Sequence, residues 1–491
     1  MEHHKKFIKD IGILGVVLAL SRAKGIILLM MLSKTLGAES YGIWTQIIVT
    51  LSFVAPIAIL GLPYALIRFL PDAKDLHDTR EHVWSTVCII FAVAFFIILP
   101  LLFFPGTFAV LLQTPVSLIA FLAFLIVLES LNSFIVDIFR AFGVIKKYAL
   151  LSFGLAGGDV LFTAIVLVMG QKLFGAVLAL VLIRFVILTI GLILLVRKIG
   201  FAIPHFLYVK KYLKFGLPTV AANISHWTVQ VSDRYFIATF WGVLFVGYYA
   251  PAYTVGLIIN LFILPIMLIL QPTVSKLFAE KNIYEVKRYL SYSMKYIFFI
   301  TIPAAFGLVA LSRQVLTILS TPEIAFHSSP IVPFVALSIV LYGIYGIFSQ
   351  VFFLFKKTTI DGLIWMASAV LTLILNFALI PTFGIMGAAL ATLIAYVVSL
   401  VATVIYVSRH LSFPIDWKFA FKTIVASLLM SVIISFFSIE GMLQTVLAAV
   451  GGVTMYLIFM LLMKSFGQSE KDFFLAFIKN SNKTIGEKDI I

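Results

Sequence analysis

The chain of 491 residues is unusually apolar: 62% of its residues are hydrophobic, 12% are charged, and the mean hydropathy is +1.13. About a quarter of the residues in soluble domains are charged, so this composition excludes a soluble protein and indicates a polytopic membrane protein. The formal net charge of +15 comes without the basic and aromatic pattern of nucleic-acid-binding modules, so we expect no nucleic-acid partner.

Apolar segments long enough to span a membrane follow one another along the chain. Runs this long favour helices, because a helix satisfies its own backbone hydrogen bonds in lipid. The sequence therefore predicts an all-α integral membrane protein with about 14 transmembrane helices. We expect these helices to begin near Ile11, Ile43, Val83, Val116, Tyr148, Leu173, Leu217, Val246, Met294, Ile331, Gly362, Gly384, Phe419 and Met442.

The first segment carries two basic residues, Arg22 and Lys24, between apolar runs at 11–20 and 25–32. Neither run alone reaches the roughly 20 residues of a spanning helix, so both belong to one helix with the charges near its middle. A lipid-facing charge there costs about 2.5–3.5 kcal/mol, which makes an intramembrane cation a functional-site hypothesis. The two residues are about 200° apart on a helical wheel. We therefore expect only one of them, Arg22, to face a lumen.

Further charges lie near the middle of the next helices: Glu129 in the fourth, Asp159 in the fifth and Arg184 in the sixth. Their equal depth favours pairing, because a single buried charge is costly. Ser133 and Arg140 share a face with Glu129, and such a polar stripe fits either a lumen wall or a polar helix contact.

In the seventh helix, Asp233 and Arg234 are adjacent and about 100° apart. We expect each of them to reach a different partner and to have a structural, ion-pairing role near the outer leaflet.

The lysines and arginines define an orientation. Of the 36, 29 fall at the amino terminus, in every second loop and in the tail, while three fall in the remaining loops. By the positive-inside rule, both termini should be cytoplasmic. We expect a multi-pass protein of the plasma (inner) membrane of a prokaryote, in contact with membrane lipids.

The chain also repeats itself weakly. Lys146-Lys147 precedes Gly175-Ala176 much as Lys356-Lys357 precedes Gly387-Ala388, and Gly42 has a counterpart in Gly247. Six helices separate the copies, so the repeat is of the parallel type. This predicts two pseudo-symmetric six-helix lobes around a central lumen plus two C-terminal helices. The predicted divisions are an N-lobe at 1–198, a C-lobe at 199–410, the last two helices at 411–464 and a cytoplasmic tail at 465–491.

Several short motifs occur in order along the whole chain, and together they resemble the polysaccharide flippases (Wzx-type) of the multidrug/oligosaccharidyl-lipid/polysaccharide exporter superfamily. The matching stretches are Leu36 to Gly42, Leu60 to Pro63 with Ile67 to Phe69, Phe215 to Pro218 with Ser232 to Arg234, Val246 to Tyr249, and Leu379 to Pro381 with Gly384 to Thr392. The resemblance implies a V of two helix bundles that works by alternating access and flips oligosaccharides linked to a polyprenyl (di)phosphate.

Arginine and lysine suit the oxygens of a diphosphate. We therefore expect Arg22, Lys24, Arg184 and Arg140 to bind the diphosphate or sugar, and Asp159 and Glu129 to serve a coupling ion or an ion pair. No catalytic residue, metal or bound cofactor is expected. Transport should instead depend on a sodium or proton gradient or on the membrane potential, and glycan polymerases or glycosyltransferases are the candidate protein partners.

Two other functions remain open at this point. A multidrug or cation exporter of the same superfamily would more often present acidic residues to its ligand. A membrane-embedded glycan-modifying enzyme is disfavoured, because intramembrane histidine is scarce and no substantial outer loop is present.

Overall fold

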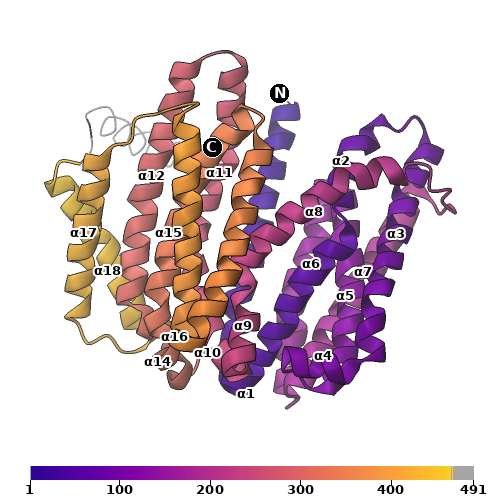
Figure 1. Cartoon of the computed structure of the whole chain (residues 1–491), viewed down its shortest axis with the longest axis horizontal. Coiled ribbons are helices and arrows are strands. Elements are labelled where there is room, and N and C mark those ends of the chain that lie inside the picture. The colour runs from indigo at the N-terminus through magenta and orange to yellow at the C-terminus, as the bar shows by residue number, and fades with distance from the viewer. Residues whose placement is uncertain (1, 466, 468–491) are drawn as a thin grey trace, which may run out of the picture.

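The computed structural model describes the backbone of residues 2–465 and 467, and the side chains from residue 23 onward in that range. The described residues form helices joined by short turns (Figure 1). The first half comprises α1 (Glu2–Ile59), α2 (Leu62–Phe69), η1 (Leu70–Asp72), α3 (Leu76–Phe103), α4 (Pro105–Leu112), α5 (Val116–Ala141), α6 (Ile145–Val168), α7 (Leu173–Ile199), α8 (Val209–Val231) and α9 (Asp233–Trp241). The second half comprises α10 (Val243–Gly256), η2 (Leu257–Ile259), α11 (Asn260–Ala279), α12 (Ile283–Ala310), α13 (Ser312–Leu319), α14 (Pro322–Ser328), η3 (Ser329–Ile331), α15 (Val332–Leu354), α16 (Thr358–Ser408), α17 (Trp417–Ser435) and α18 (Gly441–Leu462).

The all-α membrane fold predicted from the sequence is confirmed. Within the described residues, 11 helices are long and apolar enough to cross a membrane. Two of them, α1 and α16, are interrupted by a glycine with non-helical backbone angles, Gly37 and Gly384, and each covers two predicted segments. Every predicted segment falls on a helix, although the count of 14 spans is not itself confirmed.

The helices form two groups that lie side by side in Figure 1. In the first bundle, α1–α7, helices α3, α5, α6 and α7 pack on one another and α1 packs on α6. In the second bundle, α8–α16, helices α11 and α12 pack together with α15 and α16, while α17 and α18 are added on the outer side of α12. We call the end that holds the loops at 70–75, 142–144, 200–208, 280–282 and 355–357 the basic end, and the other the opposite end.

At the opposite end, the bundles meet through a reciprocal contact between α1 and α10. A methyl group on Gly42 would overlap the carbonyl of Val243, and one on Gly247 would overlap the carbonyl of Ala38. Gly42 and Ala38 precede Gly247 and Val243 by the same number of residues, so related positions of the repeat face each other. This is the geometry of a two-fold contact, in which one surface packs on its own copy.

Near the basic end, α8 joins the two bundles. Its first turns pack on α2, where Gly216 and Gly61 leave no room for a side chain between the two backbones. Its later turns pack on α16. Helix α8 therefore runs obliquely from the first bundle to the second (Figure 1).

Candidate functional site

A central cavity of about 630 Å³ lies between the two bundles. Helices α1, α5, α6 and α7 form one wall, and α8, α9 and α10 form the other. Most of the lining is apolar, which makes its few polar groups the candidates for ligand recognition. The polar and charged lining residues are Lys24, Tyr41, Thr45, Ser52, Glu129, Ser133, Asp159, Arg184, Gln230, Arg234, Tyr253 and Thr254.

Four charged residues from four helices form one connected group in this wall, here called the charged network: Lys24, Glu129, Asp159 and Arg184. Arg184 donates from Nε to Glu129 Oε2 at 2.6 Å and from Nη1 to Asp159 Oδ1 at 2.7 Å. Lys24 Nζ donates to the other oxygen, Asp159 Oδ2, at 2.9 Å. The pairing of Asp159 with Arg184 expected from their depth is therefore present.

Burial divides the charged network into an inner and an outer part. The Arg184 and Asp159 side chains are 6% and 2% exposed, whereas those of Lys24 and Glu129 are 31% and 26% exposed. Asn132 supports the inner part by donating to the backbone carbonyl of Arg184 at 2.8 Å. Two cations balance two carboxylates, so the group is neutral as it stands. Lys24 has one carboxylate partner and is the cation that a ligand can reach.

The other predicted cations lie elsewhere. Arg140 forms an ion pair with Asp137 at 3.0 Å, is 40% exposed and does not line the central cavity. The backbone of Arg22 belongs to α1, but its side chain lies outside the described residues. Of the two cations predicted near the middle of the first helix, Lys24 is the one whose described side chain lines the cavity.

A second polar group lies where α8 passes into α9. Arg234 Nη1 donates to Asp233 Oδ1 at 2.6 Å, and Tyr249 donates to Asp233 Oδ2 at 2.5 Å. The guanidinium also lies 4.0 Å from the ring centre of Tyr253. Asp233 and Arg234 are consecutive residues of α9, and each also reaches a partner of its own: the Tyr249 hydroxyl for Asp233, and the backbone carbonyl of Gln230 and the Tyr253 ring for Arg234. Their mutual ion pair is present.

The sequence did not single out several polar residues of the site. Gln230 and Tyr253 line the opposite wall of the cavity, and Gln46 on α1 donates to the backbone carbonyl of Arg234 at 3.0 Å. Uncharged polar residues are common in membrane helices, so composition alone gave no signal for them. The sequence offered one signal for this wall: Gln230 lies one helical turn before Arg234.

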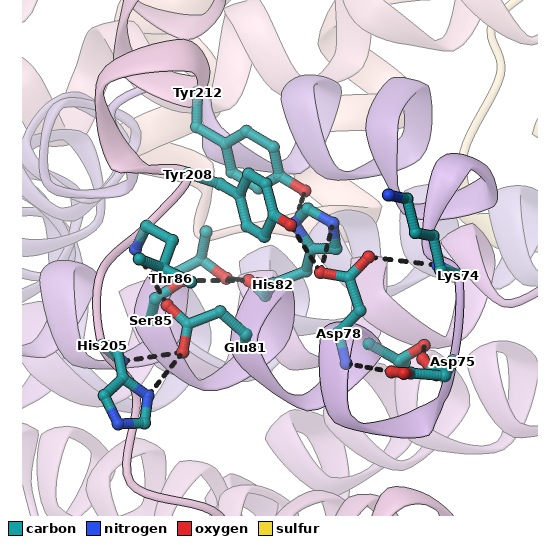
Figure 2. A network of polar contacts seen from close by, with 12 residues as sticks. Lys74, Asp75, Asp78, Glu81, His82, Ser85, Thr86, His205, Tyr208 and Tyr212 are labelled. Atoms are coloured by element: carbon teal, nitrogen blue, oxygen red, sulfur yellow. Dashed lines mark hydrogen bonds and ion pairs between the residues drawn. The ribbon is translucent and has the colours of Figure 1, made fainter.

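A third polar network holds the 200–208 linker between the bundles against the start of α3 (Figure 2). The buried carboxylate of Glu81 accepts hydrogen bonds from the backbone N–H groups of His205 at 2.7 Å and Leu207 at 3.0 Å. Trp84 donates to the carbonyl of Gly200 at 3.0 Å. The first bundle therefore fixes the linker along its whole length.

Tyrosines at the start of α8 complete this network. Tyr208 donates to Asp78 at 2.7 Å, and Tyr212 lies 2.8 Å from His82 Nδ1 (Figure 2). The hydrogen bond to Asp78 raises the pKa of the Tyr208 phenol above its ordinary value. Tyr208 therefore remains a protonated donor well above neutral pH.

We expect Glu81→Ala to release the linker. Hydrogen bonds to a charged group contribute about 1.5–3 kcal/mol each, so local opening should increase by about tenfold or more. Limited trypsin digestion would measure this as faster cleavage after Lys210 or Lys211. Glu285→Ala, which removes an acid of another loop region at the basic end, is the control. An unchanged cleavage rate in Glu81→Ala would show that the carboxylate does not hold the linker.

The two-bundle arrangement is shared with solved transport proteins. The lipid II flippase MurJ in an inward closed conformation superposes with a TM-score of 0.77 at 17% identity, covering 91% of this chain and 98% of that one. An inward-facing multidrug resistance MATE family transporter of the MOP superfamily gives 0.65 at 15% identity, covering 80% and 95%. These likenesses show that the chain shares the fold of these transport proteins.

The chain belongs to the polysaccharide biosynthesis protein family, whose model matches residues 7–278, more than half of the chain, and this confirms the resemblance seen in the motifs. The MatE family model matches residues 218–379. A curated relative, the probable low-salt glycan biosynthesis flippase Agl15 of Haloferax volcanii, is 25% identical over 228 residues. That match spans 46% of this chain and about half the length, 48%, of the relative.

Proposed function

We propose that this protein moves a polyprenyl-(di)phosphate-linked oligosaccharide from the leaflet at the basic end to the leaflet at the opposite end by alternating access. The observation that carries the proposal is the central cavity between two related bundles, whose wall holds Lys24 and Arg184 together with their partners Glu129 and Asp159. Family membership and the glycan flippase among its relatives support the class of substrate.

Lys24 is the proposed first contact for the diphosphate. An ammonium binds phosphate oxygens as a point charge, and its one carboxylate partner, Asp159, can keep its bond to Arg184 when Lys24 turns to the ligand. Arg184 is held by two carboxylates and stays in place. An anion can therefore replace Asp159 as the partner of Lys24. Asp159 stays paired with Arg184, so no buried acid is left unpaired and binding remains reversible.

Two features support an inward-facing state for this structure. The reciprocal contact of Gly42 and Gly247 joins the bundles at the opposite end. The chain also superposes better on an inward-facing MATE transporter, with a TM-score of 0.65, than on an outward-facing one, with 0.54. In the proposed cycle the glycine contact opens as the basic end closes. The positive-inside pattern supports a cytoplasmic basic end in the plasma membrane of a prokaryote.

For coupling, we propose that Glu129 or Asp159 takes up a proton or sodium ion. A second cavity of about 310 Å³ between α5 and α6 is also lined by all four residues of the charged network, Lys24 included, together with Asp137 and Tyr148. The carboxylates therefore border two cavities. A cation that enters through this second cavity would compensate the negative charge of Asp159 while Lys24 binds the substrate.

Reconstitution tests both parts of this proposal. In proteoliposomes that contain a polyprenyl-diphosphate-linked oligosaccharide, we expect the glycan to become accessible to an external lectin faster than in protein-free vesicles. Collapse of the sodium and proton gradients should slow this step. No acceleration in any gradient would contradict the flippase assignment, and a rate that is unaffected by collapsing both gradients would contradict the coupling.

A multidrug exporter is the second candidate, because the MatE model matches 218–379 and MATE transporters share the fold. Export of a cationic dye from cells distinguishes the two functions. We expect no dye export by this protein, since the most exposed group of the charged network, Lys24, is a cation. Dye export that is lost in Glu129→Gln would favour the exporter.

A further inference from the structure

An apolar groove of about 460 Å³, here called the lateral groove, lies at the seam between the two bundles and is separate from the central cavity. Helices α1, α3, α4 and α5 of the first bundle and α8, α9 and α16 of the second enclose it. Leu111 and Leu373 are 60% and 40% exposed, so the groove opens to the outside of the bundle. The large side chains that line it are those of Phe53, Phe108, Leu111, Trp227, Phe236 and Leu373.

The polar side chains that line the lateral groove already have hydrogen-bond partners within the protein. Thr50 and Tyr235 share a hydrogen bond of 2.7 Å, and Trp227 donates from its indole nitrogen to Ser52 at 3.0 Å. Phe53 packs on Trp227 with ring centres 4.3 Å apart. The groove therefore offers carbon surface to a ligand, and its volume lies in the range of about 300–1,000 Å³ typical of ligand pockets.

The lateral groove and the central cavity are both lined by α1. Ser52 lines the central cavity and the next residue, Phe53, about 100° further round the helix, lines the lateral groove. The Trp227–Ser52 hydrogen bond crosses the seam between α8 and α1. This bond therefore links a residue that lines the lateral groove to one that lines the central cavity.

We propose that the lateral groove binds the isoprenoid chain of the substrate and that Trp227 gates the seam through which the chain leaves the central cavity. The inference rests on the proposed function. A diphosphate in the central cavity remains covalently attached to its chain, and each methylene transferred to water costs about 0.8 kcal/mol. The chain must therefore pass between the bundles to stay in an apolar environment. The lateral groove is an apolar site directly beside the cavity at such a seam.

Photocrosslinking in the full chain tests the groove. Phe236 is replaced by p-benzoylphenylalanine, and the protein is placed in phosphatidylethanolamine–phosphatidylglycerol vesicles with radiolabelled undecaprenyl phosphate as the probe. Phe185 on α7, which is 60% exposed on the outer surface, is the matched control position. We expect severalfold more label at position 236 than at 185, competed by unlabelled undecaprenyl phosphate and not by added phospholipid. Equal labelling, or competition by phospholipid, would overturn the proposal, since the groove would then hold any acyl chain.

A second variant tests the gate and separates the two proposals. Trp227→Phe keeps the ring and removes the donor to Ser52, so we expect unchanged labelling at 236 and an altered rate of glycan flipping. An unaltered rate would overturn the gate. Labelling at 236 without any flipping would remove the proposed function and leave the chain-binding site standing. Flipping with equal labelling at 236 and 185 would remove the groove alone.

Discussion

Lys24→Ala should reduce glycan flipping by about 10- to 100-fold while leaving the protein folded in the membrane. The estimate follows from the loss of one charge-assisted contact to phosphate, about 1.5–3 kcal/mol, at about 1.4 kcal/mol per tenfold change. Folding should be little affected, because the Lys24 side chain is 31% exposed and Asp159 keeps its 2.7 Å bond to Arg184. Lectin accessibility in proteoliposomes measures the flipping rate, and the amount of protein extracted from the membrane with detergent measures folding.

The same helix provides the control for this prediction. Lys34 lies on α1 near the opposite end, is exposed and does not line the central cavity. The Lys34→Ala variant should therefore flip the glycan at the normal rate. Lys24→Arg should retain most of the activity, since arginine also binds phosphate oxygens. Arg22→Ala should be measured beside them, because the sequence favours Arg22 as the substrate contact. Normal flipping by Lys24→Ala would refute the role of Lys24.

The second large effect concerns stability. Arg184→Ala should destabilise the first bundle by about 3–5 kcal/mol, because it takes one ion-pair partner from each of two carboxylates, and the side chain of one of them, Asp159, is buried. We expect little folded protein in the membrane and a lower temperature of aggregation in detergent. Substituting the two cations of this wall should thus have different effects: loss of Lys24 should impair transport, and loss of Arg184 should impair folding.

A double variant distinguishes a charge effect from a packing effect. Arg184→Met with Asp159→Asn removes the buried cation together with its buried acid, so the combination should be more stable than Arg184→Met alone. Glu129 is 26% exposed and tolerates the loss of its partner better. If the double variant were less stable than the single one, the loss of packing or of Asp159 itself would be the cause, and the ion-pair explanation would fail.

The helices were predictable because each spanning segment is a long apolar run with basic residues concentrated in alternate loops. The kinks at Gly37 and Gly384 were not predicted, since a glycine in a membrane helix carries no signal for the sign of its φ angle. Nor did the sequence show that Gly42 and Gly247 contact each other. Their relation by repeat was visible, but contact between repeats depends on the packing of whole bundles.

The charged network was also predictable in part. Intramembrane charges are rare, so Lys24, Glu129, Asp159 and Arg184 stood out, and equal depth favoured pairing of Asp159 with Arg184. Which cation faces the cavity was not predictable, because a helical wheel gives the angle between two side chains but not the rotation of the helix. The linker network of Glu81 was missed because its partners are backbone N–H groups, which leave no mark in the sequence.

Helix α8 couples the two bundles mechanically. The linker bonds and Gly61 hold its first turns to the first bundle, while its last turns pack with the second bundle. Its 23 residues form a lever about 35 Å long at 1.5 Å per residue. A tilt of about 10° displaces the far end by about 6 Å, roughly one helical turn. Gln230 sits at that end, so a small rotation near the linker suffices to withdraw it from the cavity wall, and the length of α8 sets the amplitude of the movement.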